Sequence, residues 1–408
     1  MILWNFEVYY RHRYMWEDEM SIDQAPTETD RAPAYADFNP EHSAPGATPE
    51  RLAHLEEHSY VIINDFVDNP WLPKLREAGR RLTEACAPEN KYSKIDCSKG
   101  YVHRAAEDEP WAIRGLIHPA FKEPIFAEFH GSDDMLNFVR SWCGPLEPED
   151  LVMGAMLLWC NPKKNEHKLG WHRDTTWWGT GKEYFAQEAR SDGPEAYSEA
   201  AERTVWKDIL ARNKKSVHER NGVSIFLALV DEECHEFVPG SHNRWRTPFE
   251  HDVLLPKAMK EQGVPHTPSW NGKDPLPGQM SIRLKPGEAL VRIGTNIHTG
   301  HTYADRERNT LSIGWSKWSG PFTGEPQAID VRSAWQLDPA VREALPNEWM
   351  KVAWDRWAEK FTLGDTLEDR YDVFDIKNIK AGEVLGWRGE LERQAAAAGE
   401  AWEPRQTL

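Results

Sequence analysis

The stretch Leu151-Val-Met-Gly-Ala-Met-Leu-Leu-Trp159 indicates the fold most clearly. It is an uninterrupted apolar run, and three more runs of β type follow it along the chain, at Gly222–Val230, Ala289–Gly294 and Asn309–Trp315. Loops that contain Pro and Gly separate the runs, and apolar segments bounded by such residues are typical of strands. We therefore expect an all-β centre.

Helical patterns flank this centre on both sides. Thr48 followed by Pro49 is an N-cap and first-turn signal, and residues 48–86 have the pattern of a helix, a strand and a second helix. Asp338 followed by Pro339 predicts the start of a helix beyond the last strand. Apolar residues at helical spacing predict one more helical face, formed by Met350, Ala353, Trp354, Trp357 and Phe361.

These patterns divide the chain into three parts. Residues 1–47, rich in Pro, Ala, Asp and Glu, are expected to form an arm or linker. Residues 48–320 form the predicted β domain, with a helical insertion at about 183–220. Residues 321–408 are expected to form a helical extension that packs on the same domain.

Composition narrows the class of protein and of partner. The 408 residues are 28% charged and 40% hydrophobic, which is typical of a globular protein. A net charge of −17 repels phosphate backbones and anionic lipid, so we expect neither nucleic acid nor a membrane as partner. No signal peptide or membrane span is recognisable, which predicts a cytoplasmic protein. Five cysteines without a Cys-x-x-Cys pair indicate reduced thiols.

The segment Gly170-Trp-His-Arg-Asp174 carries the first chemical signal. In an extended chain side chains alternate, so His172 and Asp174 point the same way while Arg173 points to the other side. An imidazole and a carboxylate on one face form a two-point metal chelate. A solvent-facing turn with an ion pair to Arg173 is the alternative, because His-x-Asp triplets are common by chance.

A second segment, Asn296-Ile-His-Thr-Gly-His301, supplies two candidate histidine ligands, His298 and His301, and Arg308 and Thr310 follow it on one strand face. Two histidines and one carboxylate on one side of a metal leave open positions, as in non-haem Fe(II) oxygenases. An arginine placed after these ligands can hold the distal carboxylate of 2-oxoglutarate through a bidentate pair. When Arg308 is considered alone, a surface ion pair is the alternative to this role.

In these segments the sequence resembles the phytanoyl-CoA dioxygenase family of Fe(II)/2-oxoglutarate oxygenases, over roughly residues 48–318. Five segments carry the resemblance: Leu52-Ala-His-Leu-Glu-Glu-His-Ser-Tyr-Val-Ile-Ile-Asn-Asp-Phe66, Trp171-His-Arg-Asp174, Phe226-Leu-Ala-Leu-Val-Asp231, Phe237-Val-Pro-Gly-Ser-His242, and His298 through Arg308. The resemblance implies a mainly β core arranged as a double-stranded β-helix (a cupin-like jelly roll) with flanking helices.

The same resemblance implies a site. Iron would be held by His172, Asp174 and His298, and the far carboxylate of 2-oxoglutarate by Arg308 and Thr310. O₂ and 2-oxoglutarate would be consumed, with succinate and CO₂ as products, while a C–H bond of a small or medium organic substrate is oxidised. Hydroxylation is the expected outcome; desaturation, epoxidation or ring formation would use the same ligands.

Several details remain specific to this chain. His298 is preferred to His301 as ligand because its spacing to Arg308 suits the family better, and only one of the two faces the metal. His301 is left as a residue that lines the pocket, and His242 is expected to close a turn. Ser59 stands where the family often has Gly. Asp174 favours oxygen chemistry, since family members that halogenate replace this carboxylate.

The substrate pocket is predicted less closely. Trp177 and Trp178 follow the metal motif, and either can stack on a substrate or pack in the core. Arg104 and Arg114 lie where the family folds a loop over the site, so either can bind an anionic group; an ordinary surface position is the alternative. A homodimer is left open.

Two other functions share these residues. A Zn²⁺- or Mn²⁺-dependent hydrolase or isomerase also uses two histidines and a carboxylate, although hydrolysis has no need of Arg308 as a carboxylate anchor. A non-catalytic jelly-roll binding protein that happens to contain His-x-Asp is the third hypothesis.

Overall fold

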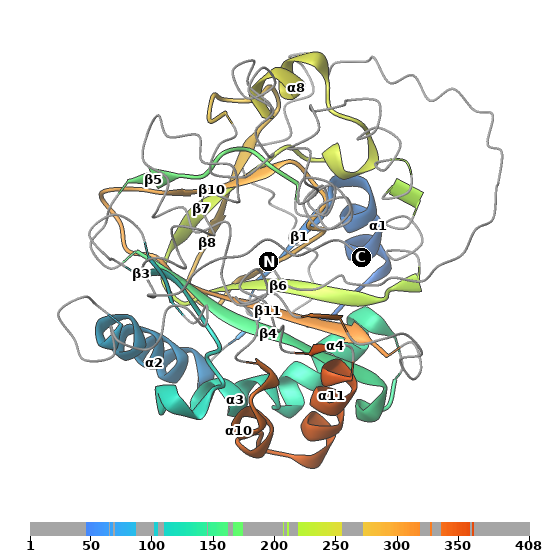
Figure 1. Ribbon diagram of the computed structural model, residues 1–408. Coiled ribbons are helices and arrows are strands. Elements are labelled where there is room, and N and C mark those ends of the chain that lie inside the picture. The colour runs from blue at the N-terminus through green and yellow to red at the C-terminus, as the bar shows by residue number, and fades with distance from the viewer. Residues whose placement is uncertain are drawn as a thin grey trace, which may run out of the picture.

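The computed structural model describes residues 46–64, 66–67, 70–86, 102–104, 110–144, 146–161, 166–173, 207, 210–211, 219–254, 272–318, 327–328, 336–359 and 361–362. Two antiparallel sheets face each other in this part of the chain, and a layer of helices covers the outer face of the larger sheet (Figure 1).

The larger sheet contains the strands that the apolar runs predict. Its order is β1 (Tyr60–Ile63), β9 (Ala289–Arg292), β6 (Gly222–Ala228), β11 (Asn309–Lys317), β4 (Leu151–Cys160), β3 (Pro110–Arg114) and β2 (Val102–Arg104). Every neighbouring pair is antiparallel. β11 lies at the centre, with Thr310 opposite Trp159 on one side and Ala228 on the other.

The smaller sheet was not predicted from apolar runs. Its order is β5 (His167–Lys168), β10 (His298–Thr302), β7 (Glu232–Phe237) and β8 (Met280–Leu284), again antiparallel throughout. His298 lies opposite Phe237 and Gly300 lies opposite His235, so these residues share one face of the sheet.

Alternation along the strands of the larger sheet produces two hydrophobic cores. In β1, Val61 and Ile63 point to the helices, whereas Tyr60 and Ile62 point to the smaller sheet. The core between the sheets also contains Phe226, Ala228, Phe237, Met280, Ile282, Leu284 and Leu290. The predicted jelly-roll fold with flanking helices is thus confirmed, and within the described residues the sheets do not close into one barrel.

The helices that flank the sheets are α1 (Pro49–His58), α2 (Trp71–Ala85), α3 (Ile125–His130), α4 (Asp133–Cys143), α8 (Pro248–Leu254), α10 (Pro339–Glu343) and α11 (Glu348–Ala358). Thr48 and Asp338 accept backbone N–H groups as N-caps, as predicted. Phe361 is a correction: α11 ends at Ala358, and Phe361 lies in β13 (Phe361–Thr362), which pairs with β12 (Gln327–Ala328).

The C-cap of α1 is Ser59, which stands where the family that the sequence resembles often has Gly. Ser59 has φ 73° and ψ 9°, in the left-handed region, and its N–H donates to the carbonyl of Leu55. Glycine adopts this conformation with less strain than serine does. Here the serine hydroxyl accepts a hydrogen bond from the amide of Asn296, at 3.1 Å.

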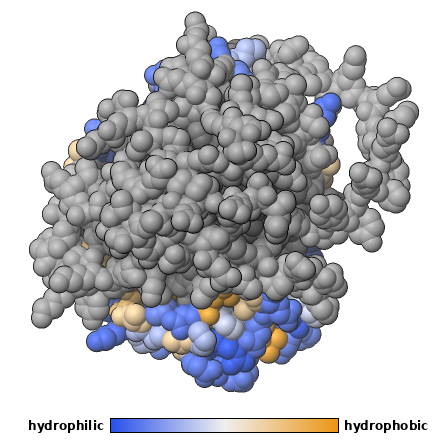
Figure 2. Space-filling view, viewed as in Figure 1, coloured by the Kyte–Doolittle hydropathy of each residue, from blue (hydrophilic) through white to orange (hydrophobic). Residues whose placement is uncertain are grey.

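The described part of the C-terminal extension packs on the larger sheet, where Trp357 contacts Val152 and Trp349 lies against Trp315. At the bottom of the view, where the helices lie, the described surface is mainly hydrophilic with a few hydrophobic residues (Figure 2). No described helix combines the length and hydrophobicity of a membrane span. Cys86, Cys143 and Cys160 are buried free thiols. The division into three parts stays a prediction, because residues 1–45 and most of 174–218 lie outside the described residues.

Candidate functional site

His172 and His298 come from distant parts of the chain and meet on the inner side of the smaller sheet. They form an antiparallel bridge: the N–H of His172 donates to the carbonyl of His298 at 3.0 Å, and the reverse bond measures 2.9 Å. Their ring centroids lie 4.3 Å apart. Both residues are buried, with 6% and 4% exposure. The predicted pair of imidazole ligands is therefore brought together.

The two imidazoles have the same tautomer. Nδ1 of His172 donates to the carbonyl of Gly170 at 2.9 Å, and Nδ1 of His298 donates to the carbonyl of Asn296 at 2.9 Å. A carbonyl can only accept, so each Nδ1 bears a proton, and in the neutral imidazole the ring lone pair is then on Nε2. Such a bond to the second nitrogen is the usual way in which proteins orient a metal-binding histidine.

Arg173 fixes the segment that carries His172. Its guanidinium is buried and points away from His172, as alternation predicts. Nη1 donates to the carbonyls of Ser241 and Thr295, at 2.6 and 3.0 Å, and Nη2 donates to that of Arg244, at 3.1 Å. One side chain thus joins three segments around the histidine pair, and the alternative of a solvent-facing turn does not hold for it.

The Pro-Gly-Ser-His turn positions the second histidine. The hydroxyl of Ser241 accepts the N–H of Ile297 at 2.7 Å, directly before His298. His242 closes the turn as expected, since its Nε2 donates to the carbonyl of Glu56 in α1 at 2.9 Å. The turn therefore has a structural role.

Arg308 and Thr310 meet a carboxylate of the protein itself. Arg308 Nε donates to Oε2 of Glu232 at 3.1 Å, and the hydroxyl of Thr310 donates to the same oxygen. All three residues are buried. The alternative interpretation of Arg308, as an arginine in a surface ion pair, is therefore excluded. A Cβ built on Gly300 would lie 4.0 Å from Arg308 Nη1, which places the guanidinium beside the strand that carries His298.

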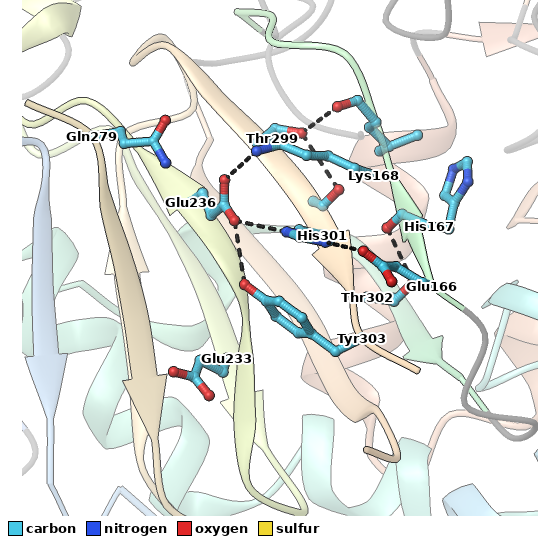
Figure 3. Close-up of polar contacts among 12 residues, drawn as sticks. Glu166, His167, Lys168, Glu233, Glu236, Gln279, Thr299, His301, Thr302 and Tyr303 are labelled. Atoms are coloured by element: carbon cyan, nitrogen blue, oxygen red, sulfur yellow. Dashed lines mark hydrogen bonds and ion pairs between the residues drawn. The ribbon is translucent and has the colours of Figure 1, made fainter. Parts of the chain in front are cut away.

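His301 lies on the opposite face of β10 from His298, because three residues separate them. Its Nδ1 contacts Oε1 of Glu236 at 2.9 Å, and the hydroxyl of Tyr303 donates to the same oxygen at 3.3 Å (Figure 3). Lys168 Nζ donates to Oε2 at 2.7 Å. Burial raises the pKa of Glu236, but the bonds from Lys168 and His301 outweigh it and leave the pKa below its usual value.

Two residues near the histidine pair were missed by sequence reasoning. The ring of His235 lies parallel to that of His298, with centroids 6.4 Å apart, and Glu232 is paired to Arg308. Both lie in β7, whose sequence Glu232-Glu-Cys-His-Glu-Phe237 lacks the alternation of a half-buried strand. The Pro-Gly-Ser-His turn that follows was the available signal, because a strand usually leads into such a turn.

The structure describes only some of the other predicted site residues. Asp174, Trp177 and Trp178 lie outside the described residues. Arg104 ends β2, and only its backbone is described. Arg114 ends β3 opposite Leu157 and is 3% exposed, so the surface alternative is wrong for it. Within the described residues, no group of three His, Cys, Asp or Glu side chains could hold a metal ion. The predicted third ligand, Asp174, lies outside them.

No family model matches the chain, and no curated protein is significantly similar to it. Among solved structures, AviO1 from Streptomyces viridochromogenes shares 14% identity over 68% of this chain and all of its own, with a TM-score of 0.41. EctD from S. alaskensis with bound Fe shares 12% over 66% of this chain and 77% of its own (TM-score 0.43). EvdO2 from Micromonospora carbonacea var. aurantiaca complexed with 2-oxoglutarate shares 14% identity over 68% of this chain and 95% of its own, with a TM-score of 0.37. All three TM-scores are below 0.5, so the likeness is loose. The fold is assigned from the order and register of the strands.

Proposed function

We propose that the protein is an Fe(II)- and 2-oxoglutarate-dependent oxygenase of the phytanoyl-CoA dioxygenase type. The observation that carries the proposal is the pair His172 and His298, joined by a β-bridge, with each Nδ1 bonded to a carbonyl. Two ligands of one metal ion at about 2.1 Å must lie within about 4 Å of each other, and ring centroids 4.3 Å apart allow this.

The donor set fits ferrous iron once Asp174 is added. Asp174 follows His172 by two residues, so in an extended chain its carboxylate would lie on the same side as the imidazole. Two histidines and one carboxylate leave one side of the ion for other ligands. Iron bound there would supply the activation of O₂ and of 2-oxoglutarate, with succinate and CO₂ as products.

The position of Arg308 supports 2-oxoglutarate as the co-substrate. Gly300 lies two residues after His298 on the same face of β10, which is a step of roughly 7 Å. The guanidinium of Arg308 lies beside Gly300, so a short dicarboxylate could reach from the histidine pair to the arginine. The apolar side chains between the sheets, among them Phe226 and Phe237, would exclude water from this space.

The substrate is proposed to be a small or medium organic molecule with an unactivated C–H bond, and hydroxylation its main outcome. Desaturation, epoxidation or ring formation would need the same residues. Arg114, buried on β3, is the described residue proposed to receive an anionic group of the substrate. The net charge of −17 disfavours nucleic acid as the substrate. The protein is proposed to be cytoplasmic.

Anaerobic absorption spectroscopy tests the proposal. Fe(II) and 2-oxoglutarate together should produce a weak visible charge-transfer band with the wild-type chain. His172→Ala, Asp174→Ala and His298→Ala should each abolish it, whereas His301→Ala, on the opposite face of β10, should retain it. A wild-type chain without the band, or a band that survives His172→Ala, would contradict the proposed function.

A further inference from the structure

We propose that Glu232 is a built-in competitor for the distal carboxylate of the co-substrate. Its side chain accepts the hydrogen bonds of Arg308 Nε and of the Thr310 hydroxyl, so a dicarboxylate that is to accept these bonds must displace it. The relevance to 2-oxoglutarate rests on the proposed function, whereas the competition itself concerns any small dicarboxylate.

The contacts at this carboxylate are those expected for a bound ligand. Arg308 and Thr310 both donate to one oxygen of Glu232, Oε2. The side chain of Glu232 is 1% exposed and that of Arg308 is 6% exposed, so the pair is removed from solvent. A charge-assisted bond from an arginine and a bond from a hydroxyl can together hold one carboxylate. Here the two donors hold a carboxylate of the protein itself.

The hydroxyl of Thr310 distinguishes competition from mere orientation of Arg308. A threonine hydroxyl has one proton to donate, and Thr310 donates it to Glu232. The same proton cannot be donated to a ligand while Glu232 remains in place.

Charge leads to the same conclusion. Arg308 and Glu232 together are neutral, so the pair attracts a second carboxylate far less than a lone guanidinium would. Two carboxylates at one buried arginine would also repel each other. Neutralising Glu232 should therefore strengthen dicarboxylate binding, whereas loss of an orienting residue would weaken it.

Glutarate is the appropriate probe, because it has the two carboxylates of 2-oxoglutarate but no keto group for metal chelation. Its dissociation constant would be measured by isothermal titration calorimetry on the metal-free full chain. Glu232→Gln should bind glutarate more tightly than wild type by about tenfold or more. Glutarate should also raise the melting temperature of this variant more than that of wild type.

Two control variants locate the effect. Glu233→Gln changes the adjacent glutamate, which pairs with Arg283 and Arg306 instead, and should bind glutarate as wild type does. The double variant Glu232→Gln/Arg308→Gln lacks the anchor and should lose the gain. With Mn(II) present and without O₂, Glu232→Gln should also bind 2-oxoglutarate more tightly, whereas 2-oxobutyrate, which lacks the distal carboxylate, should bind both chains equally.

Equal or weaker glutarate binding by Glu232→Gln would overturn the proposal. If this variant does not fold, Glu232→Asp replaces it: the shorter side chain withdraws the carboxylate by one methylene, and glutarate should again bind more tightly than to wild type. Failure of the proposed function has a different signature, because 2-oxoglutarate would then bind wild type and His172→Ala alike in the presence of Mn(II). The glutarate comparison would still decide the role of Glu232.

Discussion

Replacing Arg173 with methionine should lower both the stability of the protein and its affinity for metal. Arg173 donates three hydrogen bonds to backbone carbonyls, at 2.6, 3.0 and 3.1 Å, and joins the His172 segment to two other segments. Methionine has a similar length but no donor, so Arg173→Met would leave these buried carbonyls without this partner.

The size of the effect follows from these contacts. A hydrogen bond to a charged group contributes about 1.5–3 kcal/mol, so three of them contribute at least about 4.5 kcal/mol before other terms. Removing the guanidinium also removes the cost of burying its charge, and we expect a net loss of about 3 kcal/mol. For a chain of this size that lowers the melting temperature by roughly 3–4 °C. Metal affinity should fall about tenfold or more, as for other residues that orient ligands.

Thermal unfolding of the metal-free chain and competitive titration with Mn(II) measure the two effects. Arg76→Met is the matched control, because Arg76 Nε also donates to a backbone carbonyl, that of Leu229, at 2.6 Å, but on the helical side of the larger sheet. The control should lose stability and keep its Mn(II) affinity. Equal Mn(II) affinities for Arg173→Met and wild type would refute the positioning role of Arg173.

Two further predictions concern stability and pH. His130 is fully buried and stacked on Trp315, without a hydrogen-bond partner for either ring nitrogen among the described residues, and burial lowers its pKa to about 3. Because the unfolded chain binds this proton near pH 6.5, the free energy of unfolding falls by about 1.4 kcal/mol for each pH unit between 6.5 and 3. Between pH 7 and pH 5, His130→Phe should therefore lose about 2 kcal/mol less of its free energy of unfolding, measured by urea titration, than wild type does. An equal loss in the two chains would contradict this. The lowered pKa of Glu236 stabilises the fold above pH 4.5, and this contribution disappears as the pH falls through the folded-state value. Glu236→Gln should thus be less stable than wild type at pH 7, with a difference that shrinks below pH 4.5; a constant difference would contradict the reasoning.

The larger sheet could be predicted from the sequence because its strands are buried on both faces. Continuous apolar runs such as Leu151–Trp159 and Asn309–Trp315 result from this burial, and they correspond to β4 and β11. Helix starts were also predictable, since Thr48 and Asp338 are local capping signals that need no tertiary context.

The smaller sheet could not be predicted in the same way, because polar residues lie on both of its faces. In β7, His235 points to the histidine pair and Glu236 points to Lys168 and His301 on the other face. Neither face is continuously apolar, so the period-two signal is absent. His298 itself was recognised through its motif rather than through a strand pattern.

The same limit applies to the contacts of the site. Spacing predicted His172 and His298 as a pair of metal ligands and Arg308 as a carboxylate anchor, and these roles stay predictions. Spacing could not show that Arg308 pairs with Glu232, because the pairing depends on strand register between residues far apart in the chain.

A crystal structure of the chain grown anaerobically with Mn(II) and 2-oxoglutarate would show whether the two histidines bind one metal ion. We expect one metal ion at about 2.1 Å from Nε2 of His172 and of His298, with the carboxylate of Asp174 as the third protein ligand. Imidazoles that bind separate ions, or a single ion that leaves either histidine unligated, would contradict it.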